Sequence, residues 1–483
     1  MVPDLTHRRR MLVLAICCSS LFIVGLDVTI VNLALPSIRD DLGSSLSGLQ
    51  WVIDAYTLVL ASLLMLGGST GDRIGRRRTF QAGLVLFGAG SLLCSLASTT
   101  GWLVAFRALQ AVGGSMLNPV AMSIITNVFT DRAERARAIG VWGSVIGLSM
   151  ALGPLLGGAL VGAVGWRSVF WMNVPVVVAV VVLAARFVPE SRAPRARPFD
   201  FSGQLLMIVL LAGVTFGIIE GPVHGWGSPL IVGSFAAAGA ALVALLVVES
   251  RRAEPLLDPR FFASVPFSAA TLIAVAAFAA LAGFLFLNSL YLQDVRGYSP
   301  LHAGLLTLPM AAMTVLLPPI SGRIVATRGT RLPLLVGGAG IAASGALLLS
   351  LDVDTPLLLL VAAYVVFGVG FGMVNAPITS TAVSGMPVTQ AGVAAGVAST
   401  SRQVGSALGV AVLGSLVTVQ LGASTTVGFA AAARPAWIAV IGCGLAVLIL
   451  GLVSTTPWAR ETARRTAERF AVAVPAPAGA PAR

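Results

Sequence analysis

Long apolar stretches fill most of the chain, and short polar segments separate them. A helix that crosses the hydrocarbon core of a bilayer needs about 20 apolar residues. Fourteen stretches reach that length, with boundaries uncertain by roughly 2–4 residues. They lie at about 11–34, 48–67, 79–98, 102–127, 138–164, 169–188, 202–221, 228–249, 266–292, 301–321, 331–350, 355–383, 393–419 and 434–456. The pattern predicts an all-α polytopic membrane protein with fourteen spans.

The first stretch has features of a secretory signal peptide and features that argue against one. Arg8, Arg9 and Arg10 precede it, as in a signal peptide. The apolar stretch is long, however, contains Asp27 and has no small-residue cleavage site. We therefore expect it to remain as a transmembrane helix.

Composition narrows the class of protein further. Of 483 residues, 57% are hydrophobic and only 10% are charged, whereas soluble domains carry about 25% charged residues. Soluble enzymes, disordered proteins and secreted disulfide scaffolds are thereby excluded. The four cysteines all lie in apolar stretches and form no CxxC pair, so we expect no metal site and no disulfide framework. The chain has no lysine, which excludes a P-loop ATPase.

The arginines are distributed very unevenly over the loops and tails. If the N-terminus is cytoplasmic, 25 of the 31 fall on the cytoplasmic side and four on the other. Cytoplasmic loops are enriched in basic residues, so this asymmetry predicts an even number of spans with both termini inside. It also accounts for the net charge of +12 without a nucleic-acid partner.

A weak internal repeat suggests two related halves. The segment 114–119 (GSMLNP) resembles 371–377 (FGMVNAP), and such repeats are typical of transporters with a site between the halves. We predict an N-terminal tail, a six-helix bundle, a connector with two inserted helices, a second six-helix bundle and a basic, disordered tail. Their boundaries are 1–10, 11–188, 189–264, 265–456 and 457–483.

Three charged residues lie inside the predicted spans of the first half. Asp27, Asp54 and Arg107 each sit about 8–10 Å from the same end of their span, at 1.5 Å per residue. Charged residues at such depth are rare and usually functional. The two acids are candidate counter-ions for Arg107 and candidate proton-coupling groups. An ion pair that only locks helices together is the alternative.

Two further ionisable residues are harder to assign. Arg402 lies near mid-membrane, where it would pair with an anionic group, line a cavity or contact backbone carbonyls. Glu220 lies at the end of its span, and we expect it to be an interfacial residue in solvent.

Several motifs, in order along the chain, resemble those of one family. They are 26–36 (LDVTIVNLALP), 50–56 (QWVIDAY), 68–78 (GSTGDRIGRRR), 107–114 (RALQAVGG), 153–158 (GPLLGG), 166–175 (WRSVFWMNVP) and 401–405 (SRQVG). Together they resemble the major facilitator superfamily, and within it the fourteen-span drug:proton antiporters. The resemblance covers roughly 11–456 and implies the major facilitator fold, with two six-helix bundles and two extra central helices. It also favours Asp27 as the coupling acid.

Two of these motifs suggest parts of a gate. Asp72 stands at a helix end, and we expect it to pair with Arg132 or Arg135 as a latch on the inner side. Small residues and Pro154 give the helix near 153–158 a smooth, slightly bent face that suits close contact with the second half. The gating candidates are Gly68, Asp72, Arg73, Gly75, Arg76, Gly153, Pro154, Gly157 and Gly158.

The resulting hypothesis is proton-driven efflux of amphipathic, monovalent cationic drugs from a bacterial cell, without a cofactor. Substrates, protons and the bilayer are the expected partners, and we expect a monomer in the cytoplasmic membrane. The candidate substrate-binding residues are Asp54, Trp51, Tyr56, Asn118, Tyr364, Asn375 and Arg402; for each aromatic and amide, packing between helices is the alternative. A dedicated exporter of one endogenous metabolite or antibiotic remains open, as does a non-transporting sensor. An intramembrane enzyme is disfavoured because the three histidines lie far apart.

Overall fold

The computed structural model describes residues 6–193, 199–252, 258–384, 391–421 and 428–472, and almost all of them are helical. The helices in chain order are α1 (His7–Leu42), α2 (Leu46–Ile74), α3 (Arg76–Ser95), α4 (Thr100–Val128), α5 (Arg132–Val164), α6 (Ser168–Trp171), α7 (Asn173–Phe187), α8 (Phe201–His224), α9 (Pro229–Arg251), the short η1 (Pro259–Ala263), α10 (Val265–Leu290), the short η2 (Tyr291–Val295), α11 (Pro300–Arg328), α12 (Arg331–Leu348), α13 (Leu357–Val383), α14 (Ala391–Leu421), α15 (Phe429–Ser454) and α16 (Pro457–Val472).

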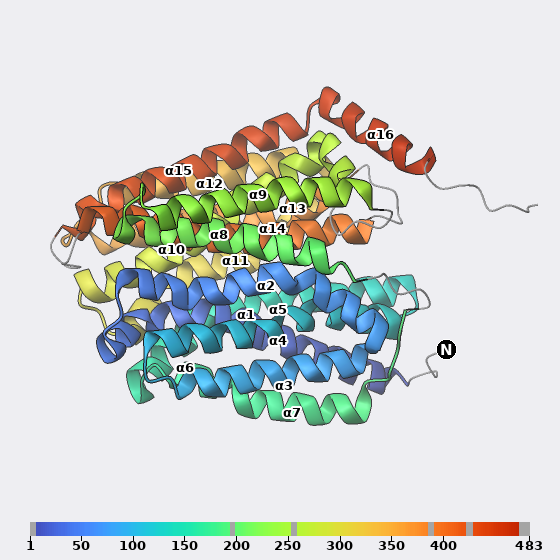
Figure 1. Cartoon of the computed structure of the whole chain (residues 1–483), viewed down its shortest axis with the longest axis horizontal. Coiled ribbons are helices and arrows are strands. Elements are labelled where there is room, and N and C mark those ends of the chain that lie inside the picture. The colour runs from blue at the N-terminus through green and yellow to red at the C-terminus, as the bar shows by residue number, and fades with distance from the viewer. Residues whose placement is uncertain (1–5, 194–198, 253–257, 385–390, 422–427, 473–483) are drawn as a thin grey trace, which may run out of the picture.

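The long helices lie alongside one another in two groups (Figure 1). Helices α1–α7 form the first half and α10–α15 the second half, and the hairpin α8–α9 packs on both through α2 and α14. The halves meet where α5 contacts α11 and where α2 contacts α14. The start of α1 and the helix α16 lie at the same end of the molecule, at the right in Figure 1. We call this end the terminal side and the other end the opposite side.

Within the described residues, thirteen segments are long and apolar enough to cross a membrane. Every predicted stretch coincides with one helix, except 169–188, which coincides with α6 and α7 together. Of these segments, α3 alone falls outside the thirteen. Its first turn contains Arg76, Arg77 and Arg78, which lower the hydropathy of a helix only 20 residues long.

The stretch predicted at 169–188 is broken into α6 and α7 at Met172. Pro175 has no N–H group and therefore cannot bond to the carbonyl of Trp171. The amide of Met172 makes the last bond of α6, to the carbonyl of Ser168, and the chain restarts as a helix at Asn173.

The expectation of a disordered tail from residue 457 is wrong for Pro457–Val472, which forms α16. Thr456 caps this helix by accepting a hydrogen bond from the amide of Ala459. Glu461 accepts from Arg464 and Arg465 along the exposed face. Phe470 packs on Phe261 of η1, with ring centroids 5.1 Å apart, so tertiary contacts help to hold the helix. Residues 473–483 lie outside the described part of the chain.

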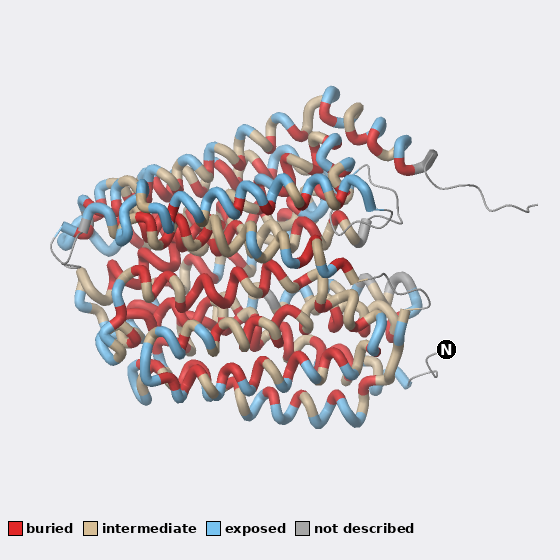
Figure 2. Tube along the Cα trace, in the orientation of Figure 1, coloured by how far each residue is buried: buried red, intermediate tan, exposed pale blue. Residues whose placement is uncertain are grey.

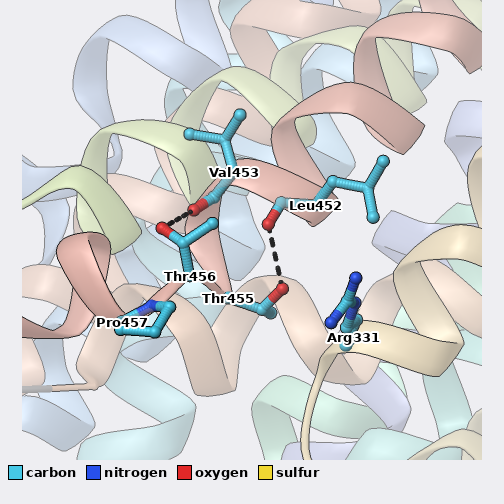
Figure 3. Close-up of a pocket in the computed structure, with 6 residues that line it drawn as sticks. All are labelled: Arg331, Leu452, Val453, Thr455, Thr456 and Pro457. Atoms are coloured by element: carbon cyan, nitrogen blue, oxygen red, sulfur yellow. Dashed lines mark hydrogen bonds between the residues drawn. The ribbon is translucent and has the colours of Figure 1, made fainter.

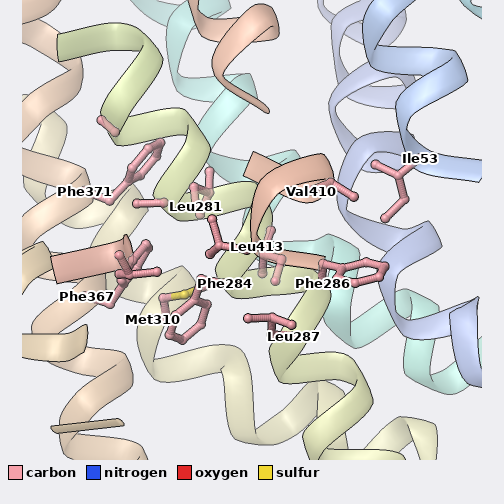
Figure 4. Close-up of a cluster of buried hydrophobic side chains, with 14 of the residues drawn as sticks. Ile53, Leu281, Phe284, Phe286, Leu287, Met310, Phe367, Phe371, Val410 and Leu413 are labelled. Atoms are coloured by element: carbon pink, nitrogen blue, oxygen red, sulfur yellow. The ribbon is translucent and has the colours of Figure 1, made fainter. Parts of the chain in front are cut away.

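Residues are buried where helices contact one another, and many apolar residues on the outer faces are exposed (Figure 2). The largest buried cluster joins α10, α13 and α14 to residues of α1 and α2. Figure 4 shows Ile53 of α2 beside Val410 of α14, so apolar packing continues across the contact between the halves. Exposed Leu, Val, Ile and Phe side chains on the outer faces are the surface expected to meet lipid.

Candidate functional site

Asp27 and Arg107 form an ion pair in the middle of the first half. Arg107 Nη1 lies 2.5 Å from Asp27 Oδ2, and the side chains are 1% and 0% exposed. Gln110 Nε2 donates to Asp27 Oδ1 at 2.9 Å, and Asn173 Nδ2 lies 3.4 Å from the same oxygen. Donors from α4 and α7 therefore converge on a carboxylate carried by α1.

The guanidinium of Arg107 is held in place from further directions. Its Nε donates to the backbone carbonyl of Val52 at 3.1 Å, and Nη1 also donates to Gln110 Oε1 at 2.8 Å. Its carbon lies 4.2 Å from the ring centre of Tyr56, which gives a cation–π contact. Arg107 thus links α1, α2 and α4, and a change in its bond to Asp27 would affect all three helices.

Asp54 is as deeply buried as Asp27 but lies outside this network. Its Oδ1 is 3.4 Å from the hydroxyl of Thr57, and its Oδ2 has no hydrogen-bond partner among the described residues. The expected depth of Asp54 did not bring it to Arg107. Tyr56, which lies under Arg107, follows Asp54 by two positions, and side chains two positions apart on a helix do not share a face. Asp54 is a buried carboxyl group with unused hydrogen-bonding capacity.

The candidate aromatic and amide residues occupy different surroundings. Tyr364 is fully buried inside the second half, where its hydroxyl hydrogen-bonds to Asn288 and its ring packs on Phe284. Tyr56 is fully buried under Arg107. Asn118 and Asn375 are half-buried on α4 and α13, and Asn118 Oδ1 has no partner among the described residues.

Trp51 links the first half to the inserted hairpin. Its Nε1 donates to Glu220 Oε1 of α8 at 2.8 Å, and its ring lies 6.2 Å from Phe216. Glu220 also lies 3.4 Å from Nδ1 of His224. The expectation that Glu220 is simply solvated at the interface is wrong, since the indole of Trp51 gives it a partner on another helix.

Arg402 is half-buried on α14. Its Nη2 donates to the hydroxyl of Thr379 on α13 at 2.6 Å, and its Nε has no partner among the described residues. The guanidinium carbon lies 5.9 Å from the ring centre of Phe278. These contacts hold a positive charge in the second half, without an acidic partner among the described residues.

Helix α5 presents its small residues to both halves. A Cβ added to Gly157 would lie 2.7 Å from the side chain of Ile30 on α1. A Cβ on Gly158 would lie 2.5 Å from the carbonyl oxygen of Pro300 on α11. Gly304 of α11 meets the backbone of Pro154 in turn. The predicted close approach of this helix to the second half is present.

The family model of the Major Facilitator Superfamily matches residues 17–410. The chain belongs to the major facilitator superfamily.

Relatives within the superfamily are named for drug resistance. The chain is 36% identical over 420 residues to the multidrug resistance protein Stp of Mycobacterium tuberculosis, covering 86% of this chain and 78% of that protein. It is 39% identical over 404 residues to the tetracenomycin C resistance and export protein of Streptomyces glaucescens, covering 83% and 74%. A crystal structure of a bacterial homologue of the human lysosomal transporter Spinster, in an inward-facing and unoccupied conformation, matches 98% of this chain and 100% of its own, with TM-score 0.64 and 16% identity.

This member of the superfamily is thus a multi-pass protein of the bacterial cell membrane, all-helical and with the major facilitator fold.

Its loop between α2 and α3 has a connected set of charges. Asp72 accepts two hydrogen bonds from Arg76, at 3.1 and 2.8 Å. Arg135 instead donates to the carbonyls of Phe129 and Thr130, so the expected bond from Arg135 to Asp72 is wrong. The side chain of Arg132 lies outside the described residues.

Glu190, in the segment after α7, contacts this loop and was not predicted from the sequence. Its Oε1 accepts from the amide of Arg77 at 3.1 Å, and Arg78 Nε lies 3.8 Å from Oε2. Gly75 beside it has φ 128°, and a Cβ there would collide with Glu190. An acidic residue shortly after α7 was visible in the sequence. Only the folded chain, however, brings Glu190 next to arginines that lie more than 100 positions earlier.

Arg73 and Gly68, the other candidates in this loop, contact different elements. The guanidinium of Arg73 stacks on the ring of Phe199 at 4.7 Å, in the segment before α8. Gly68 faces the side chain of Pro119 on α4.

A small pocket of about 250 Å³ lies at the terminal side of the transporter (Figure 3). The residues that line it are Arg331, Leu452, Val453, Thr455, Thr456 and Pro457. None of them belongs to the candidate site, and we assign the pocket no role in transport.

Proposed function

We propose that the protein exports amphipathic, monovalent cationic drugs in exchange for protons by alternating access. The observation that carries the proposal is the buried Asp27–Arg107 pair, held by Gln110 and Asn173. In this proposal the chain spans the membrane fourteen times as a monomer, with two six-helix bundles, two inserted central helices and both termini in the cytoplasm. The small-molecule substrate would bind between the halves.

Proton coupling follows from the acceptor role of Asp27. Both of its oxygens accept hydrogen bonds, so a proton on either oxygen would remove one acceptor position. The bond to Arg107 would then weaken, and Arg107 contacts α1, α2 and α4 together. Protonation at one face and release at the other would thereby change how these helices pack.

We assign Asp54 to recognition of the cationic group of the substrate. Its carboxyl oxygen Oδ2 has no partner among the described residues, and desolvated charges are costly unless they are paired. A substrate cation would supply that partner. Trp51, Asn118, Asn375 and Arg402 are the other binding residues we retain. Tyr56 would position Arg107, and Tyr364 would shape the second half.

Asp54→Asn is expected to reduce export of cationic dyes at least about tenfold, the effect of losing one charged partner worth about 1.4 kcal/mol or more. Export of neutral dyes should change little. Efflux from loaded cells, with an ethidium-like dye and a neutral dye side by side, measures both. Asp354→Asn is the matched control, since Asp354 is an exposed acid in the segment before α13. Equal loss of export for both dyes would contradict this assignment and would mean that Asp54 serves in coupling or in structure.

The topology proposal is checked by labelling single cysteines in a background without Cys17, Cys18, Cys94 and Cys443. Asp40→Cys on the opposite side should react with an impermeant thiol reagent in intact cells. Glu468→Cys on α16 should react only after the membrane is permeabilised, because we place the terminal side in the cytoplasm. The reverse pattern would contradict the orientation.

A dedicated exporter of one antibiotic is the second candidate. The name of the Streptomyces glaucescens relative, a resistance and export protein for tetracenomycin C, favours it. Accumulation assays with several cationic and neutral dyes, with and without a protonophore, separate the two. Protonophore-sensitive export of several unrelated cations supports the first candidate, and export of none of them supports the second.

A further inference from the structure

An ion pair joins the two halves at the opposite side of the molecule. Arg39 stands in the last turn of α1, and Asp294 lies in η2 directly after α10. Arg39 Nη1 lies 2.6 Å from Asp294 Oδ2, and Nη2 lies 2.9 Å from Oδ1. This two-pronged geometry is the strong form of an arginine–carboxylate pair. The side chains are 21% and 8% exposed, so water screens the pair only in part.

Three other side chains bond across the halves near this pair. Gln293 Nε2 donates to the carbonyl of Leu33 at 3.1 Å, and the Ser289 hydroxyl donates to the carbonyl of Asn32 at 2.5 Å. On the neighbouring contact, Gln50 Nε2 lies 3.0 Å from the carbonyls of both Val410 and Ala411. All of these bonds join neutral groups, and their acceptors are backbone carbonyls. Arg39–Asp294 is the bond among them that involves two charges.

Packing between α5 and α11 changes along the length of these helices. Toward the opposite side, Gly158 and Gly304 are in tight contact with the backbone of the other helix. Toward the terminal side, a Cβ added to Gly140, Gly143 or Gly322 would meet no described atom within 4 Å. The halves are therefore closed against each other at the opposite side and less closely packed toward the terminal side.

We propose that Arg39 and Asp294 are gating residues, whose ion pair latches the opposite side shut and must break before the transporter opens there. The inference rests on the proposed alternating access, to which it adds named residues. A pair at the rim suits this task, because water can replace each partner when the halves separate. A deeply buried pair would leave its charges without solvent during opening.

The latch is tested by the distance between spin labels across it. Leu96→Cys in the first half and Val353→Cys in the second are exposed positions on the opposite side. The native cysteines are replaced, and spin labels are attached to the two new ones. Pulsed electron–electron double resonance on the purified full-length protein then reports the open and closed populations, without drug or pH gradient. Arg39→Gln and Asp294→Asn should each raise the ratio of long to short distances by about tenfold, the scale of one charge-assisted bond.

Arg39 also donates to Asp40, its neighbour within the first half, at 3.2 Å. Across the halves, however, both substitutions break the same bond, so the double variant Arg39→Gln/Asp294→Asn should match the single variants in the distance ratio rather than add to them. Arg167→Gln is the matched control: it breaks the ion pair with Asp41, a 2.5 Å contact that lies on the same side but within the first half. Unchanged distances in the single variants, additive shifts, or an equal shift in Arg167→Gln would each overturn the latch. Because the measurement involves neither drug nor proton gradient, its result is independent of whether the protein exports cationic drugs.

Discussion

Asp27→Asn is expected to abolish proton-driven export, with a loss of at least about 100-fold in the initial efflux rate, if coupling requires a titratable group at this position. Three donors face the Asp27 carboxylate: Arg107, Gln110 and Asn173. An asparagine would turn an NH₂ group toward at least one of them and would leave Arg107 buried without a counter-charge. Breaking a buried ion pair in this way costs about 3–5 kcal/mol of stability.

A loss of folding must be separated from a loss of coupling. Asp27→Asn/Arg107→Gln removes both charges, so it should recover thermal stability relative to Asp27→Asn while export stays absent. The melting temperature of the purified protein and dye efflux from cells, measured on the same variants, give the two readouts. Protonophore-sensitive export by Asp27→Asn at the rate of the parent protein would contradict the assignment. Recovery of export in the double variant would show that the pair is structural.

Gly158→Leu is expected to stop transport by a steric route. The added Cβ would lie 2.5 Å from the carbonyl oxygen of Pro300 and 2.7 Å from Cα of Leu301. Both neighbours are backbone atoms that cannot rotate away, so the leucine would force α5 and α11 apart. We expect the closed arrangement of the opposite side to be lost and efflux to fall at least about tenfold, the scale of a 1.4 kcal/mol penalty.

Gly140→Leu on the same helix is the matched control. No described atom lies within 4 Å of the Cβ that this substitution would add. Efflux and expression should therefore stay close to those of the parent protein. Equal loss in Gly140→Leu would mean that α5 tolerates no large residue anywhere, and unchanged efflux in Gly158→Leu would mean that the contact can open without cost.

Hydropathy predicts the helices well because a bilayer imposes one requirement on every span. Each of the predicted stretches coincides with a helix, or in one case with the consecutive helices α6 and α7. About 20 apolar residues and internal backbone hydrogen bonds are needed at every crossing. The same reasoning placed Asp27 and Arg107 at one depth, and the structure brings them together. Depth says nothing about direction around a helix, however, and for that reason it could not show which of the two acids is the counter-ion of Arg107.

Contacts between segments far apart in the chain could not be predicted from the sequence. Glu190 meets the arginines of the α2–α3 loop, and Asp294 meets Arg39 across 255 positions. Charges in loops also serve topology, so a single sequence offers no sign of which ones are paired. The helix α16 was missed for a different reason: its composition is polar, and part of its stability comes from packing on η1.

The central claim is that export is driven by a proton gradient through Asp27. The direct measurement uses the purified protein in liposomes with an acidic lumen, and follows accumulation of a radiolabelled monovalent organic cation. The account predicts accumulation that depends on the pH gradient, collapses with a protonophore and is absent for Asp27→Asn. Accumulation that persists without the gradient, or that Asp27→Asn supports equally, would contradict it.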